Sequence, residues 1–293
     1  MSARSLLALL AASALPSVQS LAIRQSETPV WLTLPPTPAL PAPITEVKTP
    51  VDGVELWMQQ YNEEAGSTPI VMIHGGLGYS AYFGAVISRL IEGGHYVIAV
   101  DRRGHGRSTF NSADVFTFDM FAQDTFQLLS QKGISKYNIV GWSDGAATTL
   151  AALLNSTIEA HIERAFVFGG FSVPEDTNAT FTDTAIYSEF VSRCQTEYST
   201  LQPTANFTEF ATKVGTLEAT LPQWTDADLA EINGSKVTIA GAEYEEAVNR
   251  DVAPRLNKAI IGSNLVILKN VSHFAPLQDP DQFTKAVEDF LLV

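Results

Sequence analysis

Cysteine is nearly absent from this sequence, because Cys194 is the only one among 293 residues. No disulfide can form within the chain, so the fold has to be stabilised by its core, and 45% of the residues are hydrophobic. No motif surrounds Cys194 in its helix-like segment, and we expect it to be a buried structural residue.

Basic residues are also few. The chain has 18 Lys and Arg against 32 Asp and Glu, which gives a formal net charge of −14. Nucleic acids and anionic membrane surfaces are bound through clusters of Lys and Arg, and the sequence contains none. We therefore expect no nucleic-acid partner.

Long apolar runs are absent beyond the N-terminus, so we expect no membrane span. The N-terminal run at residues 6–15 follows Arg4 but is too short to cross a bilayer, and Val18 and Ser20 provide the small residues of a cleavage site. This pattern predicts a secretory signal peptide at residues 1–20 and a secreted protein. Glycosylation sequons agree with secretion, and they occur at Asn155, Asn178, Asn206, Asn233 and Asn270.

Prolines are concentrated just after this segment, at positions 29, 35, 36, 38, 41 and 43. Proline fixes the backbone φ angle and donates no hydrogen bond, so residues 21–43 are predicted to form an extended strap or linker. The globular domain is expected to occupy residues 44–293. No internal repeat is visible.

Short β-rich runs alternate with helical patterns along this domain. We expect helices around residues 82–92, 118–132 and 146–154, and strands at 69–73, 96–100, 137–140, 165–168, 236–240 and 265–268. Such alternation predicts an α/β fold with a parallel sheet covered by helices on both faces. Residues 47–60, with a turn at Asp52 and Gly53, are predicted to form an antiparallel hairpin at the edge of the sheet.

A long interval without strand signals separates the fourth and fifth of these predicted parallel strands. We expect residues 171–231 to form an inserted helical lid, rich in aromatic side chains that pack it onto the body or line an apolar pocket.

The strongest local motif is Gly-Trp-Ser-Asp-Gly at residues 141–145. It directly follows a predicted strand and opens a predicted helix, which is the setting of a nucleophile elbow, where a serine is exposed on a strained turn. Ser143 is therefore the candidate nucleophile. A glycine-rich structural turn is the alternative.

A serine hydroxyl needs a base to remove its proton, and His273 is the candidate. It follows the last predicted strand and precedes a helix that is expected to begin near Asp279 and Pro280. Of the other histidines, His74 and His105 lie in motifs before the serine, and His95 and His161 lie at strand entrances. None has metal-ligand spacing. We expect neither a metal nor a cofactor.

From about residue 44 to its end, the chain resembles the α/β-hydrolase fold family. The matching segments are His-Gly-Gly-Leu-Gly at 74–78, Asp-Arg-Arg-Gly-His-Gly-Arg-Ser at 101–108, the elbow at 141–145, and Ser-His-Phe at 272–274. The resemblance implies a mostly parallel eight-stranded sheet flanked by helices, and an oxyanion hole formed by the backbone amides of Gly76 and Asp144. Segment 101–108 is expected to be a structural turn beside the site.

The carboxylate that orients the histidine is less clear from the sequence. Family members usually place an aspartate three residues after Gly241, where this chain has Tyr244. A one-residue insertion makes Glu245 the preferred candidate. The alternatives are Glu243, Glu246 and, after the preceding strand, Asp176 or Glu175.

These features together predict a secreted serine hydrolase that cleaves a carboxylic ester or lactone of a small, apolar substrate. Amide hydrolysis, carbon–carbon bond hydrolysis and cofactor-free perhydrolase activity are alternatives on the same fold. A ligand-binding protein without turnover is the alternative from a different class.

Overall fold

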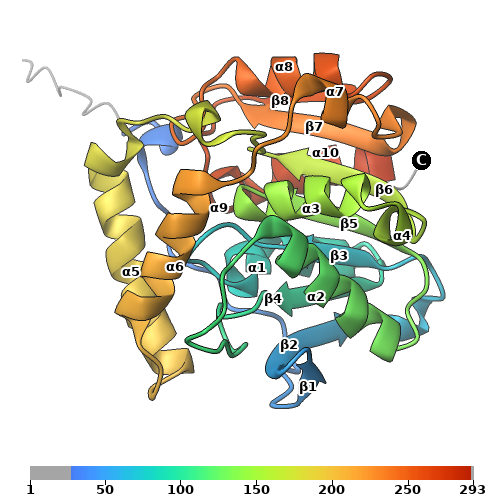
Figure 1. Ribbon diagram of the computed structural model, residues 1–293, viewed down its shortest axis with the longest axis vertical. Coiled ribbons are helices and arrows are strands. Elements are labelled where there is room, and N and C mark those ends of the chain that lie inside the picture. Colours follow the sequence, from blue (N-terminus) through green and yellow to red (C-terminus); the bar gives the residue numbers. More distant parts are fainter. Residues whose placement is uncertain (1–27, 292–293) are drawn as a thin grey trace, which may run out of the picture.

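A single eight-stranded sheet forms the centre of the computed structural model, which describes residues 28–291 (Figure 1). The expected signal peptide lies outside the described residues. The sheet order is β1-β2-β4-β3-β5-β6-β7-β8, and all strand pairs from β4 to β8 are parallel. The strands are β1 (Lys48–Val51), β2 (Val54–Tyr61), β3 (Ile70–Ile73), β4 (Val97–Asp101), β5 (Tyr137–Trp142), β6 (Ile162–Phe168), β7 (Val237–Ala242) and β8 (Asn264–Leu268).

The two N-terminal strands form the hairpin expected from the sequence. β1 pairs with β2, and β2 with β4, in antiparallel fashion. Asp52 and Gly53 form the turn with φ angles of 43° and 77°. Two consecutive positive φ angles are typical of the tight turns that match the twist of a hairpin, and Asp-Gly is a favoured pair for them.

Helices cover both faces of the sheet, because the parallel strands are apolar on both sides. Side chains of β3 alternate between two cores: Val71 and Ile73 lie in one, and Ile70 and Met72 in the other. The first core includes residues of α2 (Phe118–Gln131), α3 (Asp144–Leu154), α4 (Ser156–Glu159) and α8 (Val252–Ala259). The second includes residues of α1 (Gly84–Glu92), α9 (Ala275–Gln278) and α10 (Pro280–Leu291).

Local differences from the expected elements are small. The helix expected from residue 82 is a 3-10 turn at Ser80–Phe83 followed by α1, and α3 begins at Asp144, directly after the serine of the elbow. The short helix α9 was not expected.

The chain between β6 and β7 forms a helical insert that stands beside the sheet in Figure 1. Its helices are α5 (Ala185–Leu201), α6 (Phe207–Thr220) and α7 (Asp226–Leu229). Among its residues only Thr177 makes a β-bridge, with Val248. The insert packs onto the body through buried side chains such as Phe210, whose ring lies edge-on to that of His105 with the centroids 4.7 Å apart.

Residues 28–43 are bound to both the insert and the body. Leu34 and Leu40 are buried in the second core. Arg193 of α5 donates hydrogen bonds to the carbonyls of Leu34 and Pro35, and the Tyr61 hydroxyl donates to Pro41. The described part of this proline-rich stretch therefore connects α5 to the body as a packed strap.

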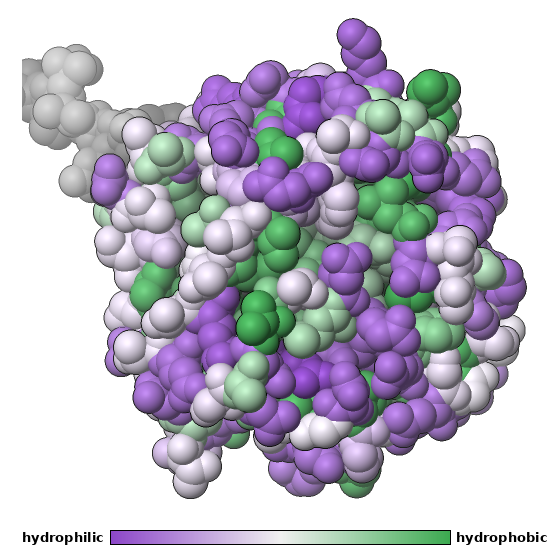
Figure 2. All heavy atoms as spheres, viewed as in Figure 1, coloured by the Kyte–Doolittle hydropathy of each residue, from purple (hydrophilic) through white to green (hydrophobic). Residues whose placement is uncertain are grey.

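Hydrophilic residues cover most of the face shown in Figure 2, and apolar groups are visible near its centre, beside the insert. Between residues 28 and 291, none of the helices is both long and apolar enough to cross a membrane.

Candidate active site

Ser143 occupies the turn between β5 and α3, where the sequence predicts a nucleophile elbow. Its φ and ψ angles are 58° and −120°. A non-glycine residue rarely adopts a positive φ, and this strain persists only where surrounding contacts hold it. The Ser143 amide donates to the carbonyl of Phe168, 2.9 Å away, at the end of the neighbouring strand β6. This bond fixes the turn against the sheet.

The two glycines of the motif are required by close packing. A Cβ atom at Gly141 would lie 2.3 Å from the carbonyl oxygen of Gly145, and one at Gly145 would lie 2.0 Å from the carbonyl oxygen of Ile73. Both distances are far below van der Waals contact, so a side chain at either position would displace α3 from the sheet.

His273 and Glu245 approach each other from the loops that follow β8 and β7. Nδ1 of His273 lies 2.8 Å from Oε1 of Glu245, and both side chains are buried. The backbone amides of Ala247 and Val248 donate to the same Glu245 oxygen at 3.0 and 3.1 Å. The carboxylate is thus fixed in place beside Nδ1, and its charge favours a proton on that nitrogen of the imidazole.

The alternative carboxylates have other partners. Glu246 accepts a hydrogen bond from the backbone amide of His273 at 2.9 Å, and Glu243 accepts from the amide of Asn270 at 3.0 Å. Asp176 forms an ion pair with Arg255, and Glu175 is exposed. Of the carboxylates that the sequence left open, Glu245 is the one placed against the imidazole ring.

Burial and neighbouring charges shift the pKa of His273 in opposite directions. Burial lowers its pKa, but the carboxylates of Glu245, Glu246 and Asp144 outweigh it, and the net pKa lies above the ordinary value of 6.5. A raised pKa makes the imidazole a stronger base when it is neutral, and it stabilises the imidazolium that forms on proton transfer.

A glycine makes room for the imidazole. Gly169 follows β6 with a φ of 61°, and a Cβ atom there would lie 2.8 Å from Cε1 of His273 and 3.1 Å from Nδ1. Any side chain at position 169 would therefore collide with the ring. No sequence motif indicates this role.

The amides expected to form an oxyanion hole lie beside the serine. Gly75 and Gly76 follow β3, and a Cβ atom at Gly75 would lie 3.2 Å from Cβ of Ser143. The amide of Asp144 is in the first turn of α3, where backbone N–H groups have no acceptor within the helix. Gly76 and Asp144 both line the cavity that contains Ser143.

The loop of Gly75 is supported by segment 101–108. Arg102 donates to the carbonyl of Gly75 at 2.8 Å, and His74 accepts from the Arg102 amide at 3.2 Å. Burial and the neighbouring Arg102 charge hold the pKa of His74 and of His105 well below 6.5. Both histidines are neutral structural residues, which agrees with the structural role expected for this segment.

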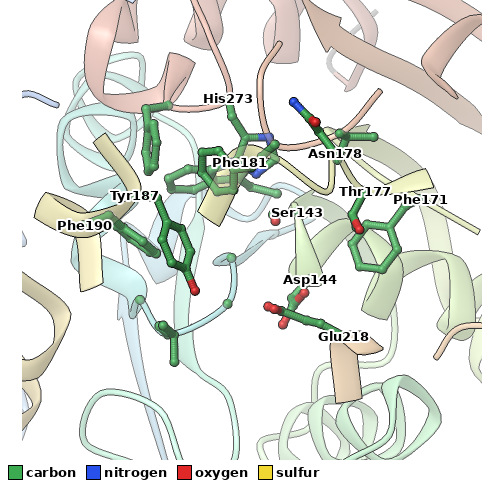
Figure 3. Close-up of a pocket in the computed structure, with 18 of the residues that line it drawn as sticks. Ser143, Asp144, Phe171, Thr177, Asn178, Phe181, Tyr187, Phe190, Glu218 and His273 are labelled. Carbon is green, nitrogen blue, oxygen red and sulfur yellow. The ribbon is translucent and has the colours of Figure 1, made fainter. Parts of the chain in front are cut away.

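The cavity above Ser143 has a volume of about 150 Å³ and lies between the body and the insert (Figure 3). Its walls are largely aromatic. They include Trp142 and Phe274 from the body, and Phe171, Phe181, Tyr187 and Phe190 from the insert.

Two charged residues near the cavity were not identified as site residues from the sequence. Glu218 of α6 lines the cavity next to Asp144. Arg102 is buried, with its guanidinium 3.8 Å from Oδ2 of Asp144. Only packing of the insert onto the body brings Glu218 to this place, so no local motif identifies it.

Cys194 is buried, as expected, with its sulfur 3.4 Å from the Tyr82 hydroxyl, and burial raises the pKa of its thiol to about 12. It is therefore a protonated, unreactive thiol at neutral pH. Among residues 28–291 no group of His, Cys, Asp and Glu side chains has the arrangement of a metal site.

Comparison with known proteins agrees with this geometry. Residues 68–185 match the family model of the alpha/beta hydrolase fold. The human protein named serine hydrolase BPHL is 27% identical over 274 residues, which cover 87% of this chain and 89% of the relative.

Solved structures are similar over most of the chain. A meta-cleavage product hydrolase from Pseudomonas fluorescens IP01 superposes with a TM-score of 0.66 at 19% identity, covering 82% of this chain and 95% of that one. The enol-lactonase from Burkholderia xenovorans LB400 has a TM-score of 0.63 at 20% identity, covering 84% and 100%. Together with the elbow and the sheet order, these similarities show that the chain has the α/β-hydrolase fold.

Proposed function

We propose that this protein is a serine hydrolase that cleaves carboxylic esters or lactones through an acyl-enzyme on Ser143. The observation that carries the proposal is the 2.8 Å contact between His273 and Glu245 in a site whose cavity also exposes the strained Ser143. A nucleophile, a base and a carboxylate that orients the base form the constellation required for acyl transfer.

In the proposed reaction, Oγ of Ser143 attacks the carbonyl carbon while His273 takes the serine proton. Glu245 stabilises the imidazolium, and the amides of Gly76 and Asp144 donate hydrogen bonds to the oxyanion. The tetrahedral intermediate collapses as His273 gives its proton to the departing alcohol. Water, deprotonated by His273, then attacks the acyl-enzyme, releases the acid and restores Ser143.

The cavity supports a small substrate with an apolar group. A volume of about 150 Å³ is close to that of an engineered apolar cavity that holds benzene. The aromatic walls favour apolar groups of this size. We therefore propose that short-chain esters are cleaved faster than long-chain esters, as measured by kcat/KM over a series of p-nitrophenyl esters from acetate to decanoate.

The test of the nucleophile is Ser143→Ala together with labelling by a fluorophosphonate probe. Ester turnover should be lost, and peptide mapping of the labelled wild type should find the probe on Ser143. The matched control is Ser199→Ala, which changes an exposed serine of α5. This variant should keep ester turnover and labelling at Ser143. Ester turnover that persists in Ser143→Ala, or a probe found on another residue, would contradict the proposal.

The same assay separates hydrolysis from ligand binding without turnover. A protein that only binds releases at most one equivalent of p-nitrophenol per chain, whereas a hydrolase releases many. Parallel assays on lactones and on p-nitroanilides separate ester cleavage from lactone and amide cleavage, since the fold alone does not distinguish them.

We also propose that the protein is secreted after removal of residues 1–20. The support is the short apolar run with its cleavage site and the exposed sequons at Asn155, Asn206, Asn233 and Asn270. N-terminal sequencing of protein recovered from the medium of a eukaryotic host should find Leu21 as the first residue.

A further inference from the structure

The strap of residues 28–43 contacts the loop that carries the acid of the proposed triad. A 3-10 turn at Val30–Leu32 within the strap places Trp31 flat against Tyr244, with the ring centroids 4.0 Å apart and an interplanar angle of 5°. Tyr244 directly precedes Glu245 in the loop after β7. The strap therefore packs against the residue next to the triad carboxylate.

A second contact reaches the loop of the base. The carbonyl of Thr33 accepts a hydrogen bond from Nε2 of Gln278 at 2.8 Å. The Gln278 side chain also accepts from the amide of Ser272 at 2.7 Å and donates to the Ser272 hydroxyl at 2.9 Å. Ser272 is buried and directly precedes His273. Trp31 and Thr33 thus reach both loops from a single turn of the strap.

The loop of the base follows a strand at the edge of the sheet. β8 is the last strand in the sheet order and pairs with β7 on one side. An edge strand has unpaired backbone groups on its free side, so the loop after it depends more on other contacts. The two loops are linked directly by the Tyr244 amide, which donates to the carbonyl of Val271 at 3.0 Å. Stacking of Trp31 limits the rotation of Tyr244 and therefore supports this link.

The strap is itself anchored away from these loops. Leu34 is buried in the second core, and Arg193 of α5 donates to its carbonyl at 2.9 Å. In Figure 1 the strap, drawn in blue, passes beside α5. It also packs closely on α1, since a Cβ atom at Gly84 would lie 2.7 Å from the carbonyl oxygen of Ala39. Its prolines restrict the unbound backbone and reduce the entropy lost on docking. The strap can therefore hold Trp31 in place.

We propose that Trp31 is a positioning residue of the hydrolase, which acts through Tyr244 to hold the Glu245 carboxylate against His273. This inference rests on the proposed ester hydrolysis, because it assigns Trp31 a part in the same triad. Neither Trp31 nor Tyr244 is among the residues that line the cavity. The effect of Trp31 therefore falls on the chemical step and not on substrate binding.

The charges around His273 provide a readout of this position. The groups that raise its pKa are Glu245 and Glu246, from the loop after β7, and Asp144, from α3. Residues 28–43 include no ionisable side chain, so a change in the strap removes none of these charges. Greater exposure to water would raise the pKa, since burial lowers it. A fall in the pKa of His273 therefore reports a carboxylate that has moved away from the ring.

The test is Trp31→Ala, followed by ester kinetics and by titration of His273. We expect kcat on a short p-nitrophenyl ester to fall about 10- to 100-fold, as for a displaced catalytic group, with KM nearly unchanged. The pKa of His273 should be lower than in the wild type. It is measured from the imidazole NMR resonance, which is assigned by its loss in His273→Asn. Trp31→Phe keeps a ring that stacks on Tyr244 and should restore most of both values.

Leu32→Ala is the matched control, because it changes an exposed side chain in the same turn and should keep the wild-type kcat and pKa. Thermal denaturation identifies the variants that are folded at the assay temperature. If Trp31→Ala does not fold, Trp31→Leu provides the same comparison, since it keeps an apolar contact without the stacked ring. A folded variant with the wild-type kcat would overturn the proposal. A loss of kcat without a fall in the pKa would also overturn it, because the effect would then not pass through Glu245.

The titration separates this inference from the proposed ester hydrolysis, because it needs no substrate. If the wild type cleaves no ester, ester hydrolysis is overturned, and a lower pKa of His273 in Trp31→Ala still supports the positioning role. Ester turnover by the wild type, together with an unchanged pKa of His273 in the folded variant, would overturn the positioning role and leave ester hydrolysis intact.

Discussion

Oε1 of Glu245 lies 2.8 Å from Nδ1 of His273 and also accepts hydrogen bonds from two backbone amides of its own loop. The amides leave the carboxylate little freedom, so it holds the imidazole in one orientation. Glu245 is not among the residues that line the cavity. Its influence on the reaction should therefore pass through His273 alone.

Glu245→Gln should consequently lower kcat and leave KM nearly unchanged. A neutral amide stabilises the wrong imidazole tautomer and does not support the imidazolium, and comparable changes in serine hydrolases cost on the order of 10³- to 10⁴-fold in kcat. Steady-state kinetics on a short p-nitrophenyl ester measure the effect. Glu243→Gln in the same loop is the control, and a larger loss in Glu243→Gln would show that the wrong carboxylate has been assigned.

The raised pKa of His273 determines how kcat/KM depends on pH at the acidic end. The imidazole must be neutral to accept the serine proton, so kcat/KM falls as the pH drops through its pKa. Burial lowers that pKa, but Glu245, Glu246 and Asp144 raise it to a net value above 6.5. The acidic limb of the kcat/KM profile should therefore have its midpoint above pH 6.5.

Glu246 offers a direct check of this assignment. Its carboxylate raises the pKa of His273, so Glu246→Gln should move the acidic midpoint to lower pH. Glu243 is not among the groups that shift this pKa, and Glu243→Gln should leave the midpoint in place. An unchanged midpoint in Glu246→Gln would contradict the prediction.

Two glycines with positive φ angles allow the cost of backbone strain to be separated from the effect of a side-chain collision with His273. Gly169 and Gly133 have φ angles of 61° and 75°, but a Cβ atom at Gly133 would meet nothing within 4 Å, whereas one at Gly169 would collide with His273. Each change to alanine should cost about 1–2 kcal/mol of the free energy of unfolding, from the left-handed conformation alone.

Activity should distinguish the two variants. Gly169→Ala displaces the imidazole, and a misplaced catalytic group can cost on the order of 100-fold in rate. Gly133→Ala should retain wild-type kcat. Thermal denaturation and ester kinetics on both proteins make the comparison, and equal activities would show that Gly169 has no part in positioning His273.

The sequence predicted the parts of the site that depend on short segments. Ser143 could be identified because strand, turn and helix are contiguous, and the elbow geometry follows from that order. The parallel strands could be placed because each is apolar on both faces, and the Asp52 and Gly53 turn identified the hairpin.

Residues that depend on tertiary packing were harder to predict. Three glutamates follow Gly241, and only the folded loop shows that Glu245 faces the ring while Glu243 and Glu246 bind backbone amides. Glu218 reaches the cavity because α6 packs over the elbow. The packing of residues 28–43 likewise depends on contacts with α5, far along the chain.

The sequons differ in how their asparagine side chains are used, which predicts where glycans occur if the protein is secreted as proposed. Asn178 lines the cavity, and its Nδ2 atom donates to the carbonyl of Glu246 at 2.9 Å. Glycosylation replaces one of the two hydrogens on Nδ2 with a sugar, so a glycan would crowd this bond beside the loop of Glu245 and occupy space in the cavity. Asn155 is exposed and uses only its side-chain oxygen, to cap α4.

We therefore expect Asn155 to be glycosylated and Asn178 to be unmodified in active protein from a eukaryotic host. Thr157→Ala and Thr180→Ala remove the two sequons in matched fashion, and intact-mass measurement before and after glycan removal reports the result. Thr157→Ala should lose the mass of one glycan, whereas Thr180→Ala should lose none. Full occupancy of Asn178 in protein with wild-type turnover would contradict the prediction, because a glycan there and an open cavity exclude each other.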